Sequence, residues 1–336
     1  MECTMKKYAE RIGTNQINPH FRCDGRENGL ILDPRREDVP LELLGFGVYR
    51  LSPDFISRDT GDKEMVLVPQ EGEFEAEING QWFRGARVGG PFALGPGGSN
   101  ASALYVPCNA RLRLRGKGEA AFFEAPALQD KPPFYRTSSE VAVVSRGEWV
   151  WRRDVVSLIS PQDASTNLVV GETYSPPGLW SGTPLHSHDR DEPQAGESDH
   201  EEVYYHRFHW KGSEKDRFGA HGVQLLMDGQ SLMNAYVIGD RSVFAIPGGC
   251  HPVVTSPVSE LLYLWGLAGK GNKLAMKDVE EFAHLKSFES VFHEMEGEPA
   301  VKILSRERFA ALSRPFTQEQ AGLLTAILKE KGYQIE

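Results

Sequence analysis

The 336-residue chain is poor in cysteine, and its four cysteines are scattered without any CxxC pair. So few cysteines exclude a disulfide scaffold. No apolar run approaches the roughly 18 residues of a membrane-spanning helix. No apolar segment follows the first seven residues, so no signal peptide is expected. The sequence therefore predicts a cytoplasmic protein with no membrane partner.

Positive charge is also in short supply. The 37 Lys and Arg residues face 47 Asp and Glu residues, which gives a net charge of −10. An acidic surface repels the phosphate backbone of nucleic acids, so we expect no nucleic-acid partner. A small anionic substrate remains compatible with this charge, because a local basic pocket can lie inside an acidic protein.

Helical periodicity is missing from most of the chain. The 34 Gly and 21 Pro residues divide it into short apolar runs, which favours an all-β fold. The run 74–78 alternates apolar and acidic residues, and Asn79-Gly80 follows it at once, which predicts a hairpin. Helical patterns occur only near the C-terminus, at 278–287, at 305–312 and after Thr317, where Gln320 completes a capping box.

These patterns divide the chain into four parts. We predict an irregular N-terminal arm at 1–40, a first β domain at 41–130, a second β domain at 131–275 and a helical extension at 276–336. The Lys131-Pro132-Pro133 segment marks the linker between the β domains. The strand spacing of the second domain suits a barrel or jelly roll. The extension is expected to serve as a scaffold or dimer element without chemistry of its own.

Histidine is absent from the first β domain, since only His20 of the ten histidines precedes His186. A metal site built on imidazole must therefore belong to the second domain. In an extended segment, His186 and His188 point to the same face and could reach one ion.

Glu202 lies in a strand-like run, and His251 follows a tight turn. Each has an ordinary alternative, since Glu202 could be a solvated strand carboxylate and His251 a turn histidine bonded to the backbone. Three imidazoles and one carboxylate together favour one divalent transition metal, such as Zn, Mn, Fe or Ni.

These residues also carry a resemblance. His186-x-His188, the later Glu202 and Pro247-Gly248-Gly249-Cys250-His251 resemble the two half-motifs of the cupin superfamily. More specifically, residues 44–270 resemble the 5-deoxy-glucuronate isomerase family of myo-inositol breakdown. The similar segments are 180–190, 197–205, 250–254 and 262–269, with 60–64 and 105–107 in the first half.

The resemblance implies two cupin-type (jelly-roll) β-barrels in tandem, with an empty first barrel and a metal in the second. It places metal ligation on four residues: His186, His188, Glu202 and His251. It implies isomerisation of an aldose-type sugar acid, 5-deoxy-glucuronate, to the ketonic 5-dehydro-2-deoxygluconate. Edge strands and two barrels also favour a homodimer.

The chain departs from the family pattern around the inferred site. Leu225, Met233, Asn234 and Cys250 replace the residues expected there, and His206 stands where an aromatic residue is expected. The first forty and last sixty residues are additions to the family core. The substrate is therefore less firmly indicated than the metal.

Isomerisation needs a proton moved between adjacent carbons, which calls for an acid or base. Tyr204 and His206 share the inferred face of Glu202 and are the candidates, although barrel packing and support of the ligands is the alternative for both. Arg153 or Arg207 could hold the substrate carboxylate, because Arg offers a planar fork. Both could equally be surface arginines.

Two other classes of function remain open. A metal-dependent cupin dioxygenase uses the same ligand set. A non-catalytic sugar-acid-binding bicupin would retain the metal without turnover, and the departures at Leu225, Met233 and Asn234 support that alternative.

Overall fold

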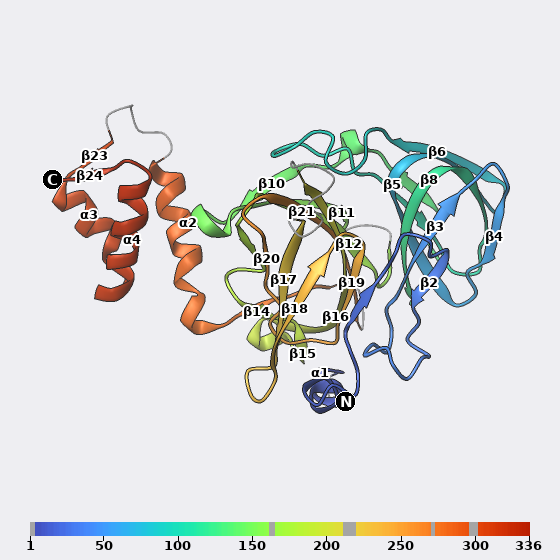
Figure 1. The fold of residues 1–336 in the computed structure, drawn as a ribbon, viewed down its shortest axis with the longest axis horizontal. Coiled ribbons are helices and arrows are strands. Elements are labelled where there is room, and N and C mark those ends of the chain that lie inside the picture. Colours follow the sequence, from blue (N-terminus) through green and yellow to red (C-terminus); the bar gives the residue numbers. More distant parts are fainter. Residues whose placement is uncertain (1–3, 161–164, 211–219, 270–272, 296–301) are drawn as a thin grey trace.

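The computed structural model describes residues 4–160, 165–210, 220–269, 273–295 and 302–336. Two β units lie side by side, and a helical extension lies on the far side of the second unit from the first (Figure 1). This arrangement confirms the prediction of an all-β chain with a helical C-terminal tail. Among the described helices, none is both long and apolar enough to cross a membrane.

The first unit is one eight-stranded sheet. Its strands are β2 (Gly29–Leu32), β3 (Gly45–Leu51), β4 (Ile56–Asp59), β5 (Lys63–Ile78), β6 (Gln81–Arg87), β7 (Ala103–Val106), β8 (Arg111–Pro126) and β9 (Phe134–Arg136). The order is β2-β3-β8-β5-β7-β9, with β4 paired to β8 and β6 paired to β5. The β5–β6 hairpin turns at Asn79-Gly80, where both residues have positive φ, as the sequence predicts.

Two strands of this sheet are longer than expected. The sequence predicts separate strands at 64–68 and 74–78 and at 112–116 and 119–124, but each pair is one strand, because the β5–β8 ladder continues between the runs. The register of β5 shifts between Pro69 and Glu71, since proline has no N–H to donate. The first half of β5 thus pairs with β7 and the second half with β6, while β8 pairs with β5 over both halves.

The second unit has two main sheets. The larger sheet is formed by β1 (His20–Arg22), β10 (Val143–Arg146), β11 (Arg153–Ile159), β12 (Val169–Ser175), β15 (Asp189–Glu192), β16 (Glu197–Trp210), β19 (Ser242–Ile246) and β21 (Ser259–Gly269). Its order is β1-β19-β16-β21-β12-β11-β10, with β15 paired to β16. The smaller sheet contains β13 (Trp180–Ser181), β17 (His221–Met227), β18 (Met233–Gly239) and β20 (Val253–Thr255) in the order β13-β20-β17-β18.

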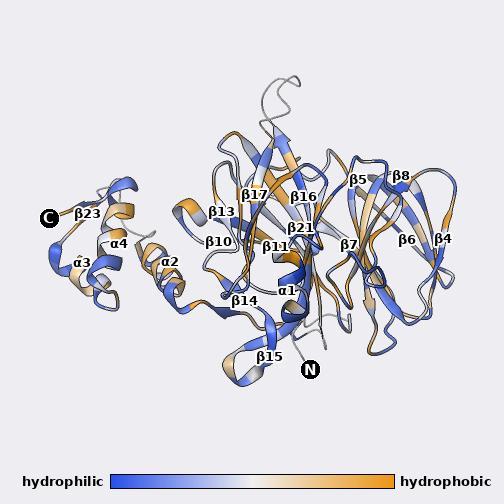
Figure 2. Ribbon diagram, turned by 60° about the horizontal axis from the view of Figure 1, so that its bottom comes forward, coloured by the Kyte–Doolittle hydropathy of each residue, from blue (hydrophilic) through white to orange (hydrophobic). Residues whose placement is uncertain are grey.

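One continuous apolar core joins the two units. Phe46 and Phe123 of the first unit lie in the same apolar cluster as Tyr205 of the second. The ring centroid of Phe46 lies 5.1 Å from that of Phe123 and 5.3 Å from that of Tyr205. Figure 2 shows strands of both units carrying hydrophobic as well as hydrophilic residues, as expected for sheets that face a core on one side only. The units are therefore packed against each other through their sheet faces.

The N-terminal segment is ordered rather than irregular. It forms helix α1 (Thr4–Gly13) and strands β1 and β2, and it contacts both units because β1 pairs with β19 and β2 pairs with β3. The sheet of the first unit also extends beyond the predicted linker, since β9 pairs with β7. The four-part division of the chain otherwise stays a prediction.

The C-terminal extension begins with a strand. β22 (Lys277–Asp278) pairs with β14 (His186–Ser187), and helix α2 (His284–Met295) follows, so this helix starts later and runs further than the pattern at 278–287 predicts. The remaining elements are β23 (Ile303–Leu304), α3 (Arg306–Ser313), α4 (Gln318–Glu330) and β24 (Gln334–Ile335). Helix α4 opens with the predicted capping box of Thr317 and Gln320.

Candidate active site

Three of the four predicted metal ligands converge inside the second unit. His188 follows β14, Glu202 lies in β16, and His251 follows the turn after β19; all three side chains are buried. The Nε2 atoms of His188 and His251 lie 3.1 and 3.0 Å from the same carboxylate oxygen, Oε2 of Glu202. The candidate ligand atoms of these three residues lie within 4.8 Å of one another.

The backbone fixes the orientation of each imidazole. The Nδ1 atoms of His186, His188 and His251 lie 2.9, 3.0 and 2.8 Å from the carbonyl oxygens of Pro184, His200 and Gly249. A carbonyl oxygen only accepts, so each Nδ1 carries the proton and donates it. Each Nε2 is then left with a free lone pair, which is the form of histidine that binds a metal.

This donor set fits a divalent cation. With Nδ1 of both rings bonded to the backbone, the two Nε2 atoms and the Glu202 carboxylate converge on one point. Burial lowers the pKa of His188, but Glu202 outweighs it and raises that pKa, so the carboxylate attracts a positive charge to this point, which a divalent cation would supply. Nε2 of His251 is buried and forms no hydrogen bond within the described residues. Burial raises the pKa of Glu202, but His188 and His251 outweigh it and lower that pKa to about 2, so the carboxylate is charged.

His186 stands slightly apart from this group. Its ring centroid lies 6.4 Å from that of His188 and 5.9 Å from that of His251. Burial lowers the pKa of His186 to about 4, which keeps its ring neutral at physiological pH. The structure therefore brings His186 beside the cluster but outside the group of three residues whose ligand atoms lie within 4.8 Å of one another.

The cluster opens into a cavity of about 610 Å³, which is within the usual size range of small-molecule sites. His186, Glu202 and Tyr204 line this cavity. Tyr263 lines it as well, with its ring centroid 4.5 Å from that of Tyr204 and its hydroxyl 2.5 Å from Oγ of Ser181. Burial raises the pKa of Tyr204 well above its usual value, so its hydroxyl keeps its proton.

Two arginines line the same cavity. Arg146 of β10 and Arg153 of β11 are direct partners across the antiparallel ladder, where like charges repel. The Arg153 guanidinium donates to the carbonyl oxygen of Trp151 at 3.2 Å. Among the described residues, neither arginine has a carboxylate within ion-pair distance. The pair therefore offers uncompensated positive charge to an anion in the cavity.

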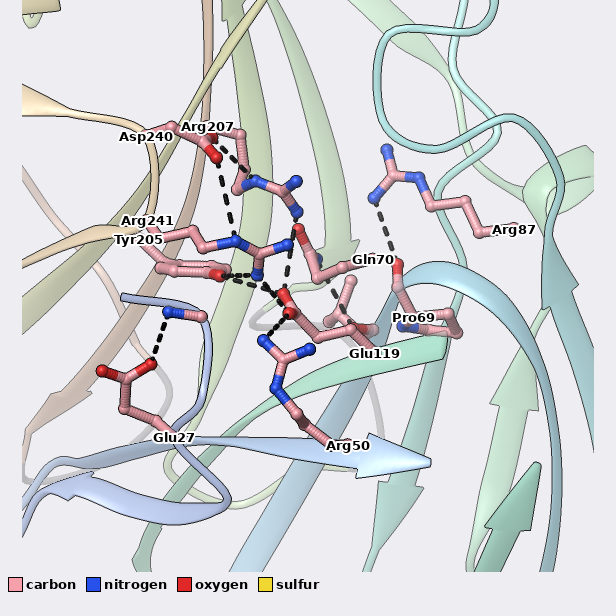
Figure 3. A network of polar contacts seen from close by, with 12 residues as sticks. Glu27, Arg50, Pro69, Gln70, Arg87, Glu119, Tyr205, Arg207, Asp240 and Arg241 are labelled. Carbon is pink, nitrogen blue, oxygen red and sulfur yellow. Dashed lines mark hydrogen bonds and ion pairs between the residues drawn. The ribbon is translucent and has the colours of Figure 1, made fainter. Parts of the chain in front are cut away.

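Two predicted residues lie outside the cavity. Arg207 projects from the opposite face of β16 into the interface between the units, where its Nε donates to Asp240 at 3.0 Å and Nη1 lies 3.7 Å from Glu119 (Figure 3). His206 is buried behind Tyr204, with Nδ1 3.1 Å from the Ser242 carbonyl and Nε2 3.3 Å from Oε1 of Gln224. The structure does not bring either residue to the cavity.

The departures from the family pattern also lie elsewhere. Of the described residues that line the cavity, none is Leu225, Met233, Asn234 or Cys250. These four residues, at which the sequence predicts a changed pocket, therefore do not form part of the cavity wall.

Sequence reasoning missed several lining residues. Tyr263 lies in an apolar run that the sequence indicates as a strand, whereas Ser181 lies in the short strand β13, which the sequence does not predict, and nothing in the pattern pairs the two residues. Lys286 and Glu289 come from α2, so the extension also contributes to the cavity instead of acting only as a scaffold. The apolar spacing of Leu285, Phe288 and Phe292 predicts which face of α2 is buried, but not what that face packs against.

Fold and site together define a cupin-like protein of two β units with a buried His–Glu–His cluster in one of them. The chain belongs to the KduI/IolB family, whose model matches residues 19–285. It is 30% identical over 252 residues to the 5-deoxy-glucuronate isomerase of Geobacillus kaustophilus (strain HTA426), which covers 72% of this chain and 86% of that protein. It is 29% identical to the 5-deoxy-glucuronate isomerase of Geobacillus thermodenitrificans (strain NG80-2), over 72% of this chain and 86% of that protein.

Solved structures support the same fold. An IolB-like protein from Salmonella typhimurium LT2 is similar with a TM-score of 0.71 and 25% identity, over 80% of this chain and 99% of that one. The oxalate decarboxylase of Bacillus subtilis is similar with a TM-score of 0.55 and 10% identity, over 92% and 86% of the two chains. At that identity the second likeness concerns the fold alone.

Proposed function

We propose that this protein is a metal-dependent sugar-acid isomerase that converts 5-deoxy-glucuronate to 5-dehydro-2-deoxygluconate. One observation carries the proposal: a single cavity is lined by Glu202 of the His–Glu–His cluster, by His186 and by an arginine pair without a carboxylate partner. A sugar acid has an aldehyde at one end and a carboxylate at the other, and the cavity offers a chemically suitable group for each. The names of the relatives support the same reaction.

His188, Glu202 and His251 would hold the metal, with His186 as the fourth ligand. The ion would be Zn, Mn, Fe or Ni, since all of these accept mixed nitrogen and oxygen ligands. A divalent ion supplies Lewis acidity, which stabilises negative charge developing on substrate oxygens.

Arg153 is the group that binds the substrate carboxylate, with Arg146 beside it. Burial lowers the pKa of Arg153, because its charge is poorly solvated there, and an anion that enters the cavity stabilises that charge. A planar guanidinium binds a carboxylate in a fixed orientation. Substrate binding thus fixes one end of the chain and directs the other end toward the cluster.

Tyr204 acts as the proton donor of the site. Its hydroxyl remains protonated, so it donates to a substrate oxygen rather than abstracting a proton from carbon. His206 is a positioning residue, because it contacts Gln224, whose Nε2 donates to the backbone oxygen of His251 at 2.6 Å. This chain of contacts holds the turn that presents His251.

The test is a proton NMR assay of the full-length protein, loaded in turn with each of the four metals and supplied with 5-deoxy-glucuronate. We expect the aldehyde to be converted to the ketone without oxygen uptake. Arg153→Met should raise KM by more than about 10-fold, because it removes hydrogen bonds to a charged group. The matched control Arg152→Met changes an exposed neighbour and should leave KM within about two-fold.

Other outcomes would identify the alternatives. Oxygen consumption with the sugar acid would indicate a dioxygenase. Tight binding of the sugar acid to metal-loaded protein without any ketone would indicate a non-catalytic binding protein. A cytoplasmic location and a homodimeric state stay predictions of this proposal.

A further inference from the structure

We infer that helix α2 of the C-terminal extension is a substrate-selecting wall of the cavity, in which Glu289 accepts hydrogen bonds from hydroxyl groups of a monoanionic sugar acid. The inference rests on the proposed function, since it concerns the same cavity. Lys286 and Glu289 both line that cavity, and both lie beyond residues 19–285, the part of the chain that matches the family model.

The extension is attached directly to the strand that carries His186. Residues His186 and Asp278 are backbone partners in the β14–β22 ladder. The Asp278 carboxylate also forms an ion pair with Nζ of Lys286 at 2.5 Å. This partly exposed pair links the first turn of α2 to β22, the strand that pairs with His186, but contributes little energy by itself.

Apolar packing fixes the rest of the helix. Leu285, Phe288 and Phe292 form the buried face of α2, and they belong to one cluster with Trp151 of the β unit. Trp151 is followed two residues later by Arg153. A second ion pair, from Lys331 to Glu148 at 2.5 Å, holds the extension at the same edge. The segment that places Arg153 is therefore the segment on which α2 packs.

Some of the charged side chains that line the cavity have an oppositely charged partner and others do not. Lys286 is paired with Asp278, but the Glu289 carboxylate has no hydrogen bond or ion pair within the described part of the chain. Arg153 likewise has no carboxylate partner there, although Glu289 is near enough to raise its pKa. An acceptor and a donor that face one cavity without pairing suit a ligand that contacts both.

The chemistry of that ligand follows from these two groups. Arg153 takes a carboxylate, and Glu289 takes hydroxyl donors. A second carboxylate on the ligand would be repelled by Glu289. The wall therefore selects hydroxylated monocarboxylates over dicarboxylates of similar length.

The experiment compares full-length, metal-loaded wild type with Glu289→Gln by calorimetry, using D-glucuronate and the dianion D-glucarate as probes. Wild type should bind glucuronate in preference to glucarate. Glu289→Gln should weaken glucuronate binding by about 10-fold and reduce the preference for it. The matched control Glu294→Gln alters an exposed carboxylate on the same helix that pairs with Arg308, and should change neither value.

Kinetics separate this inference from the proposed function. Glu289→Gln should raise KM for 5-deoxy-glucuronate by a similar factor, with kcat and metal content nearly unchanged. The inference that α2 selects the substrate would be contradicted if this variant bound both probes with unaltered affinity. It would also be contradicted if wild type did not bind glucuronate. If wild type binds glucuronate selectively but forms no ketone, the wall stands and the isomerase proposal fails.

Discussion

The two β units share a strand order but differ in what fills them. The order β3-β8-β5-β7 of the first unit corresponds to β12-β21-β16-β19 of the second. In each unit the last of these strands is followed by a proline, Pro107 or Pro247. Because the strands pair in the same register, each residue of one unit has an equivalent position in the other, and the side chains at these positions differ in chemistry.

Glu202 is the clearest example. It pairs with Ile246 just before Pro247, and Met65 of the first unit pairs with Val106 just before Pro107. Two residues further on, Tyr204 corresponds to Leu67. Met65 and Leu67 belong to an apolar cluster that fills the first unit, whereas Glu202 and Tyr204 line the cavity of the second. Function therefore depends on a few inward-facing positions of a shared framework.

Where the units meet, each unit contributes a buried glutamate that accepts backbone N–H groups of the other. The Glu64 carboxylate accepts the backbone N–H groups of Thr166, Asn167 and Leu168, which precede β12. In the other direction, the Glu201 carboxylate accepts those of residues 42–44, which precede β3. These reciprocal contacts stabilise both units whether or not a cavity is present.

The largest effect is expected when Glu202 of the second unit is replaced by methionine, the residue at the equivalent position of the first unit. Glu202→Met removes the oxygen ligand and should lower metal affinity by more than about 100-fold, since even supporting contacts are worth up to that factor. Isomerisation should fall to background. Elemental analysis and the NMR assay measure both effects.

Met65→Leu is the control for that exchange, because it alters the equivalent position of the first unit and should leave metal content unchanged. Stoichiometric metal retained in Glu202→Met would contradict the ligand assignment.

The next largest effect concerns the junction of the units. Arg87 and Glu172 form a bidentate pair at 2.5 and 2.8 Å, with both side chains almost fully buried. Arg87→Met leaves Glu172 buried without its partner and should lower the free energy of unfolding by about 4 kcal/mol. Urea denaturation measures the loss. Arg84→Met, at an exposed position on the same strand, should cost less than about 1 kcal/mol.

The reverse exchange tests how strictly the first unit excludes charge. Met65→Glu places a carboxyl group in the apolar cluster, where no imidazole is available to compensate it. The expected loss is about 3 kcal/mol of unfolding free energy. Denaturation midpoints of Met65→Glu and Met65→Leu give the comparison. Equal stability of the two variants would show that the first unit tolerates a buried carboxyl.

The smallest effect is a pH dependence at β1, the N-terminal strand that joins the second unit. Burial, aided by the charge of Arg22, lowers the pKa of His20 to about 4 from its ordinary 6.5. The unfolded state thus binds a proton that the folded state does not, so stability is complete above pH 6.5 and falls as the pH drops toward 4. Between pH 7 and pH 4.5, we expect the free energy of unfolding of His20→Gln to fall by about 2 kcal/mol less than that of wild type. Urea titrations of the metal-free proteins at both pH values measure this difference, and parallel curves would contradict it.

Much of this molecule follows from local patterns in its sequence. Turn residues and alternation place most strands, and the spacing of His186, His188, Glu202 and His251 indicates the cluster. The merging of two runs into β5 or β8 does not follow, because nothing local distinguishes a bend from a break. The order in the first forty residues is likewise a consequence of pairing with distant strands.

The sequence by itself determined the all-β class and the helical end, because strand alternation and caps act over a few residues. It also indicated the His–Glu–His cluster, through motif residues that lie far apart in the chain. Only the tertiary structure decided that Arg153 enters the cavity while Arg207 joins the unit interface. It also decided that His206 lies behind Tyr204, and that α2 completes the wall. Such choices depend on which surfaces meet across long stretches of chain, and burial and charge compensation settle them only after the chain has folded.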